Sequence, residues 1–236
     1  MTDQKHQLPA ESRSAEVDAF LRELRRVPPP PPSGKRGRLI FALDATASRE
    51  PTWDRACRIQ GEMFEATAAL GGLDVKLVYY RGFNECKASR WMTNAADLHR
   101  VMRAVSCVGG QTQIERVLAH ALAETQKQRV NALVFVGDAM EENVDRLCQL
   151  AGELGLNGVP VFLFHEGGDP IAGKAFQQIA KLSRGAYVRF DMASAERLKE
   201  LLAAVAVYAA GGYRALTAYG EKRGGDVLRL TAQLRE

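Results

Sequence analysis

The sequence LIFALDATAS, residues 39–48, joins a continuous apolar run to a short polar segment. Its first five residues lack the alternation of a strand that has one face in water, so we predict a strand buried on both faces. Such strands occur in parallel sheets that helices cover on both sides. The polar part follows the carboxyl end of this strand, which is where open α/β sheets bind their ligands.

Similar apolar runs alternate with helical patterns along the rest of the chain. This alternation predicts an α/β fold, a doubly wound and mostly parallel six-stranded sheet with helices on both faces. Residues 85–92 instead alternate polar and apolar after a short turn, which favours an antiparallel edge strand. The predicted strands are residues 39–43, 75–80, 85–92, 133–136, 159–164 and 186–190, and the predicted helices are residues 53–70, 95–105, 112–127, 143–154, 171–182 and 195–209.

The two ends of the chain differ from this pattern. Residues 15–26 have the apolar spacing of a short amphipathic helix, and the run Pro28 to Pro32 predicts a stiff polyproline II spacer, although such a run can also dock on a partner. We therefore predict an N-terminal helical region (1–27), a Pro-rich linker (28–37), an α/β domain (38–212) and a C-terminal tail (213–236).

Composition and charge exclude several classes of protein. The chain has 236 residues, of which 46% are hydrophobic and 25% charged, as in ordinary globular proteins. Its net charge of +4 lies in the two ends, since residues 38–212 carry equal numbers of acidic and basic side chains, so we expect neither nucleic acid nor a membrane as partner. No secretory signal is recognisable, which predicts a cytoplasmic location. The four cysteines lack the spacing of a zinc or redox motif.

Three separate segments place oxygen-bearing side chains at the predicted carboxyl edge of the sheet. They are Asp44-Ala45-Thr46-Ala47-Ser48, Gly109-Gly110-Gln111-Thr112 and Gly137-Asp138. Two carboxylates and three hydroxyls are hard ligands, which suit Mg²⁺ first and Mn²⁺ or Ca²⁺ next. Each segment also has a structural explanation: Thr112 with Glu115 fits a capping box, and Asp138 fits a turn after a strand.

Together these residues resemble the metal-ion-dependent adhesion site of von Willebrand factor type A domains (vWA domains), in which Asp-x-Ser-x-Ser is followed by a distant Thr and a distant Asp. Asp44, Thr46 and Ser48 match the first element, Thr112 the second and Asp138 the third. The resemblance covers about residues 38–212, including the antiparallel edge strand. Thr46 replaces the usual Ser but keeps the hydroxyl. Asp138 is followed by Ala139, where the family commonly has Gly, so a positive φ there would be strained.

The resemblance implies a function without catalysis. It indicates a protein interaction module whose divalent metal, bound by these five residues, receives an Asp or Glu side chain of a partner. Bacterial cytoplasmic members are often similar in serving MoxR-type AAA+ ATPases as partners or adaptors. Nearby acids at Glu50, Glu141 and Glu142 suggest a further hypothesis, in which one of them occupies the open metal position and masks the site.

Two other functions stay open from the sequence. A Mg²⁺-dependent phosphohydrolase of the haloacid dehalogenase type would use Asp44 as nucleophile, but Thr46 stands where that family has a second Asp. A scaffold with a decayed metal site would bind its partners elsewhere. No Gly-x-Ser-x-Gly elbow follows a strand and no phosphate-binding loop is present. His99, His120 and His165 are predicted to have structural roles.

Overall fold

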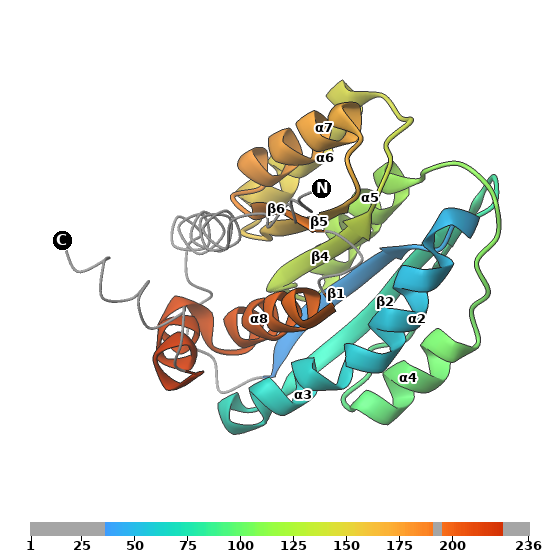
Figure 1. Cartoon of the computed structure of the whole chain (residues 1–236). Helices are drawn as coiled ribbons and strands as arrows, with labels where there is room; N and C mark the ends of the chain where they lie inside the picture. Colours follow the sequence, from blue (N-terminus) through green and yellow to red (C-terminus); the bar gives the residue numbers. More distant parts are fainter. Residues whose placement is uncertain (1–35, 191–194, 224–236) are drawn as a thin grey trace, which may run out of the picture.

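A computed structural model describes residues 36–190 and 195–223 of the chain. These residues form a six-stranded sheet of order β3-β2-β1-β4-β5-β6, in which β3 alone is antiparallel to its neighbour (Figure 1). The predicted fold class is therefore confirmed, including the antiparallel edge strand. The strands are β1 (Gly37–Asp44), β2 (Leu73–Arg81), β3 (Glu85–Ala88), β4 (Ala132–Gly137), β5 (Val161–Glu166) and β6 (Ala186–Phe190).

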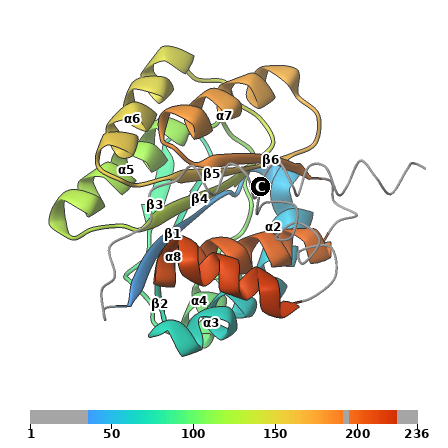
Figure 2. The same cartoon turned by 90° about the vertical axis from the view of Figure 1, so that its left-hand side faces the viewer.

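Helices cover both faces of the sheet, as the edge-on view in Figure 2 shows. Leu39, Phe41 and Leu43 of β1 lie in one core, while Ile40 and Ala42 lie in the other, so β1 is buried on both sides as predicted. The first face carries α2 (Glu50–Ile59), α3 (Gly61–Thr67), α4 (Ala95–Arg103) and α8 (Ala195–Arg223), and the second carries α5 (Ile114–Lys127), α6 (Val144–Leu156) and α7 (Pro170–Leu182).

Two elements differ from the prediction. The single helix expected at 53–70 is divided into α2 and α3 at Gln60, directly before Gly61, a residue that weakens a helix, and a 3₁₀ turn (Ala68–Leu70) follows. The edge strand expected to reach Met92 ends at Ala88. The Ser89 hydroxyl then accepts the Leu77 N–H at 3.0 Å, a local bond that replaces regular pairing, and Met92 rejoins β2 in an isolated bridge.

The C-terminal helix continues beyond the predicted boundary at residue 212. α8 breaks at Gly212, where φ is 71°, and Leu216 after the break is still buried in the core. The predicted N-terminal helix, the proline run and residues 224–236 lie outside the described residues, so the domain division stays a prediction. Within the described part of the chain, no helix has both the length and the apolar character needed to span a membrane.

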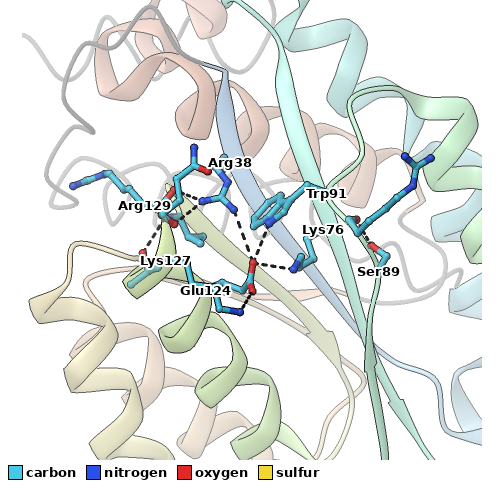
Figure 3. A network of polar contacts seen from close by, with 11 residues as sticks. Arg38, Lys76, Ser89, Trp91, Glu124, Lys127 and Arg129 are labelled. Atoms are coloured by element: carbon cyan, nitrogen blue, oxygen red, sulfur yellow. Dashed lines mark hydrogen bonds and ion pairs between the residues drawn. The ribbon is translucent and has the colours of Figure 1, made fainter.

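A buried ion cluster connects four segments at the amino end of β1, away from the polar residues that follow the carboxyl ends of β1 and β4 (Figure 3). We call the carboxyl edge of the sheet, with its loops, the rim. The carboxylate of Glu124 on α5 accepts hydrogen bonds from Lys76 Nζ at 2.8 Å, Trp91 Nε1 at 2.9 Å and Lys127 Nζ at 3.0 Å. The Arg38 guanidinium lies 3.9 Å from the Trp91 ring centre and 3.9 Å from the same carboxylate. Three positive side chains thus share one acid, which connects β1, β2 and α5 with the segment after β3.

The charge of Glu124 contributes to stability. Burial alone would raise the pKa of this carboxyl, but the hydrogen bonds from Lys76, Lys127 and Trp91 outweigh it and hold the pKa at about 2, below the ordinary 4.5. Because the folded-state pKa is the lower one, the stabilisation is complete above about pH 4.5. It is lost as the pH falls toward 2.

Replacing Glu124 with Gln removes the shared counter-charge and leaves Lys76 and Arg38 buried without it. We expect Glu124→Gln to lower the free energy of unfolding by roughly 3 kcal/mol at pH 7. Glu115→Gln is a matched control on the same helix, since Glu115 forms an exposed pair with Arg146, and it should cost less than about 0.5 kcal/mol. Urea denaturation between pH 7 and pH 2.5 measures this. The wild type and Glu115→Gln, which both keep Glu124, should have a higher free energy of unfolding than Glu124→Gln at pH 7, and this difference should shrink below about pH 4.5.

Candidate metal centre

The candidate site lies where the strand order of the sheet reverses. β1 and β4 are parallel neighbours, with Leu43 paired to Val136, so both strands end at the same edge. The chain leaves β1 toward β2 and leaves β4 toward β5, in opposite directions along the sheet. Asp44 is the last residue of β1 and Asp138 follows the last residue of β4, so the two carboxylates meet at this topological switch point.

The first polar segment folds around the carboxylate of Asp44, which is 3% exposed. One oxygen, Oδ1, accepts the Thr46 N–H at 2.7 Å, and the other, Oδ2, accepts the Tyr80 hydroxyl from β2 at 3.0 Å. Ser48 Oγ lies 3.4 Å from Thr46 Oγ1 and donates to Asp138 Oδ2 at 3.2 Å. Four of the five predicted residues are therefore brought together by direct contacts.

Thr112, the fifth predicted residue, is held by a different partner. Its N–H donates to Glu141 Oε2 at 3.1 Å, while its hydroxyl accepts the Glu141 N–H at 3.0 Å. Thr112 is 7% exposed and is thereby fastened to the loop that follows Asp138. Its hydroxyl oxygen keeps a second lone pair for another ligand.

The start of α5 is capped by Glu142, which sequence reasoning did not predict. Glu142 Oε2 accepts the Ile114 N–H at 2.7 Å and Oε1 accepts the Glu115 N–H at 2.8 Å. The capping box expected from Thr112 and Glu115 is wrong, because α5 begins at Ile114 and the Glu115 side chain pairs with Arg146. Both oxygens of Glu142 accept backbone N–H groups, which disfavours Glu142 as the masking acid. Glu141 accepts one N–H through Oε2 alone, so masking by Glu141 or Glu50 stays a prediction.

The backbone at Asp138 is fixed without a glycine after it. Among the described residues Arg184 is the one non-glycine with a positive φ, so Ala139 adopts an ordinary conformation. His165 Nε2 lies 3.3 Å from the Asp138 carbonyl oxygen, and His165 Nδ1 lies 2.8 Å from the Tyr187 hydroxyl. His165 is 1% exposed, and burial lowers its pKa. This is a structural role: the histidine positions the loop that carries Asp138.

Arg49 is a second residue that the sequence did not single out. Its Nη1 lies 2.5 Å from Glu166 Oε2 and 3.8 Å from Asp138 Oδ2, and the Thr52 hydroxyl donates to the same Glu166 oxygen. Arg49 is 3% exposed, and its Nε has no hydrogen-bond partner among the residues that the structure describes. A buried positive group therefore lies beside the carboxylates on the β5 side.

The electrostatics of the site suit a cation. Burial is the main cause that raises the pKa of Asp44, and the negative charge of Asp138 adds to it, while hydrogen bonds from Thr46 and Tyr80 act in the opposite direction. No group of three or more His, Cys, Asp or Glu side chains able to hold a metal occurs in residues 36–190 and 195–223. The donors available here are two carboxylates and three hydroxyls, a set that fits a hard divalent ion.

Comparison with known proteins identifies the fold but no close relative. No protein-family model and no curated protein matches the sequence. Solved structures do match: a von Willebrand factor type A protein from Catenulispora acidiphila has a TM-score of 0.59 at 16% identity, over 72% of this chain and 42% of that one. Proximal thread matrix protein 1 from the mussel byssus, in a structure with a zinc-occupied metal-ion-dependent adhesion site (MIDAS) motif, has a TM-score of 0.59 at 14% identity, over 72% of this chain and 45% of that one. The SpRpn10 VWA domain has a TM-score of 0.56 at 14% identity, over 72% of this chain and 95% of that one.

The chain therefore has the fold of a vWA domain, as the sequence resemblance implied. It spans less than half the length of the Catenulispora and mussel proteins, but nearly all of the SpRpn10 domain. Identities of this size establish the shared architecture. The roles of individual residues must come from the geometry of this chain.

We predict that Glu142 stabilises the start of α5, which follows shortly after Thr112. Glu142→Ala removes two acceptors from the helix start and should cost about 1 kcal/mol in unfolding free energy. The amide protons of Ile114 and Glu115 should then exchange faster. Glu142→Gln keeps an acceptor oxygen but not the charge, so its effect should be intermediate. Unchanged exchange at both amides in Glu142→Ala would contradict this role.

Proposed function

We propose that this chain is a non-catalytic, metal-dependent protein interaction module. In this proposal Asp44, Thr46, Ser48, Thr112 and Asp138 hold a divalent cation, Mg²⁺ in the first place and Mn²⁺ or Ca²⁺ as alternatives. The observation that carries it is the set of contacts Thr46–Ser48–Asp138, which joins two segments some ninety residues apart at the switch point of the sheet.

Some residues of the site orient the two carboxylates, and others would supply ligands to the ion. Tyr80 and the Thr46 N–H hold both oxygens of Asp44, which fixes the direction of its carboxylate. Ser48 positions the carboxylate of Asp138 from the opposite side. When bound, a divalent ion held largely by neutral hydroxyls keeps much of its positive field and supplies an open position for an outside oxygen ligand.

The partner that fits this site presents an Asp or Glu side chain. A carboxylate is the hard, negatively charged ligand that such a position accepts. The resemblance to bacterial cytoplasmic vWA proteins supports a role as adaptor of an AAA+ ATPase of the MoxR type, and a cytoplasmic location, predicted from the lack of a recognisable secretory signal, agrees with that role. The mussel protein's zinc-occupied MIDAS shows that a site of this kind takes a divalent ion in that protein.

The geometry favours binding over phosphoryl transfer. A nucleophilic Asp must be reached by the phosphoester itself, whereas Asp44 is 3% exposed. Its two hydrogen bonds still leave a lone pair on each oxygen, which is enough for a small cation. Thr46 also cannot serve as the acid/base that a second Asp would provide. A phosphate-ester assay in Mg²⁺ checks this: turnover that disappears in Asp44→Ala would establish the phosphohydrolase instead.

Ser48→Ala tests the metal site with little risk to the fold, because Ser48 is exposed. The variant loses one donor to the cation and the bond that orients Asp138, so we expect Mg²⁺ affinity to fall by about tenfold or more, equivalent to ~1.4 kcal/mol. Ser106→Ala is the matched control, since Ser106 is an exposed serine on a neighbouring loop whose contact is with Arg81. Isothermal titration calorimetry measures both.

The same variants separate the binding module from a scaffold with a decayed site. Partner capture from native lysate should require Mg²⁺, stop with chelator, and fail for Ser48→Ala but not for Ser106→Ala. Equal Mg²⁺ affinity in both variants, or equal capture with and without chelator, would refute the metal-dependent module.

A further inference from the structure

Two exposed apolar side chains lie on loops beside the candidate metal centre. Phe83, in the turn between β2 and β3, is 69% exposed, and Val108, in the segment between α4 and α5, is 45% exposed. We call this pair the rim patch. Exposed apolar side chains are common singly, so the position of these two is what matters.

Backbone hydrogen bonds connect the rim patch directly to the metal centre. The Gly82 N–H donates to the Val108 carbonyl at 3.4 Å, and the Val108 N–H donates to the Ala45 carbonyl at 3.0 Å. Ala45 lies between Asp44 and Thr46, and its own N–H donates to the Tyr80 carbonyl at 2.9 Å. In Figure 1 the β2–β3 turn and the green segment before α5 run side by side at this edge of the sheet.

The loops that carry the rim patch are held in place. An added Cβ on Gly110 would overlap the Gly82 carbonyl, so the two segments are in close backbone contact. The Gln111 N–H also donates to the Gly82 carbonyl at 3.1 Å, and Gln113 Nε2 donates to the Arg81 carbonyl at 3.2 Å. Phe83 and Val108 therefore lie on loops that hydrogen bonds hold in place, which lowers the conformational entropy that binding would cost.

The charged side chains around the rim patch are mostly positive, with Arg81, Lys87 and Arg116 against the single acid Glu85. Arg81 pairs with Glu85 at 2.9 Å, Glu85 pairs with Lys87 at 2.8 Å, and Arg116 donates to the Asn84 carbonyl at 2.7 Å. A partner therefore meets exposed apolar side chains with positive charges around them, and this charge complements the acid that the proposed metal site would accept. Leu156, which is 84% exposed, ends α6 at the opposite end of the sheet, near Leu182, which is 45% exposed, and away from the candidate metal centre.

We propose that the rim patch selects the partner sequence. The segment it fits carries an apolar side chain within about three residues of the acid that binds the metal, so that one residue fills the metal position while the other covers Phe83 and Val108. This inference rests on the proposed function, since the acid anchors the segment. It adds the specificity that an acid alone does not provide.

The probe for this inference is a peptide library with a fixed central Glu and random flanking residues. The wild-type protein is loaded in Mg²⁺ and bound peptides are released with chelator. We expect the released peptides to be enriched in apolar residues near the Glu. For an enriched peptide, replacing that apolar residue with Ser should weaken binding by about tenfold.

The matching protein variants are Phe83→Ser with Val108→Ser, and Leu156→Ser as control. The double variant should still bind Glu peptides in Mg²⁺ but lose the apolar preference, with affinity for the enriched peptide reduced by about tenfold. Leu156→Ser should behave as wild type. Both sites are exposed, so an unchanged melting temperature confirms that the variants are folded.

The outcomes distinguish the two levels of the proposal. If no peptide is released by chelator, or if Asp138→Asn leaves binding unchanged, the proposed function itself fails. If chelator-sensitive binding persists without an apolar preference, or if the double variant keeps that preference, the rim-patch inference alone fails. Mg²⁺-dependent self-association that the double variant abolishes would assign the patch to a second copy of the chain, and would also overturn it.

Discussion

The parallel pairing of β1 with β4 is the constraint on which the candidate site depends. The two strands are neighbours in space, yet the chain leaves them toward opposite sides of the sheet, so their carboxyl ends lie together at an edge that neither connection fills. Asp44 and Asp138 are positioned by this topology before any ligand is considered. Thr46 and Ser48 then contact them directly, while Thr112 is bonded to Glu141 in the loop that follows Asp138.

Charge is arranged differently at the amino and carboxyl ends of β1. In the cluster around Glu124 one acid is shared among three positive side chains, and burial closes it to outside groups. At the rim two acids approach each other, and Arg49 compensates them only from one side at 3.8 Å from Asp138. The first arrangement is complete in itself and stabilises the fold. We propose that a cation completes the second.

The fold could be predicted because its signals are local. The uninterrupted apolar run of residues 39–43 already indicates a strand buried on both faces, and the alternation after Asn84 already indicates an edge strand. Glu142 could not be recognised as the cap of α5, because the residues it binds are some thirty positions away. Arg49 was missed for the same reason: its burial against Glu166 depends on tertiary contacts that no local pattern encodes.

The central claim is that a divalent ion binds at the switch point of the sheet. Titration with Mn²⁺, followed by paramagnetic broadening of backbone amide signals in NMR spectra, tests it directly because broadening depends steeply on distance from the ion. If the ion binds there, the amides of Thr46, Ser48, Thr112 and Asp138 should broaden first and recover when Mg²⁺ is added, while that of Glu124 stays sharp. Broadening that begins at exposed acids such as Glu65, or that Mg²⁺ does not reverse, would contradict it.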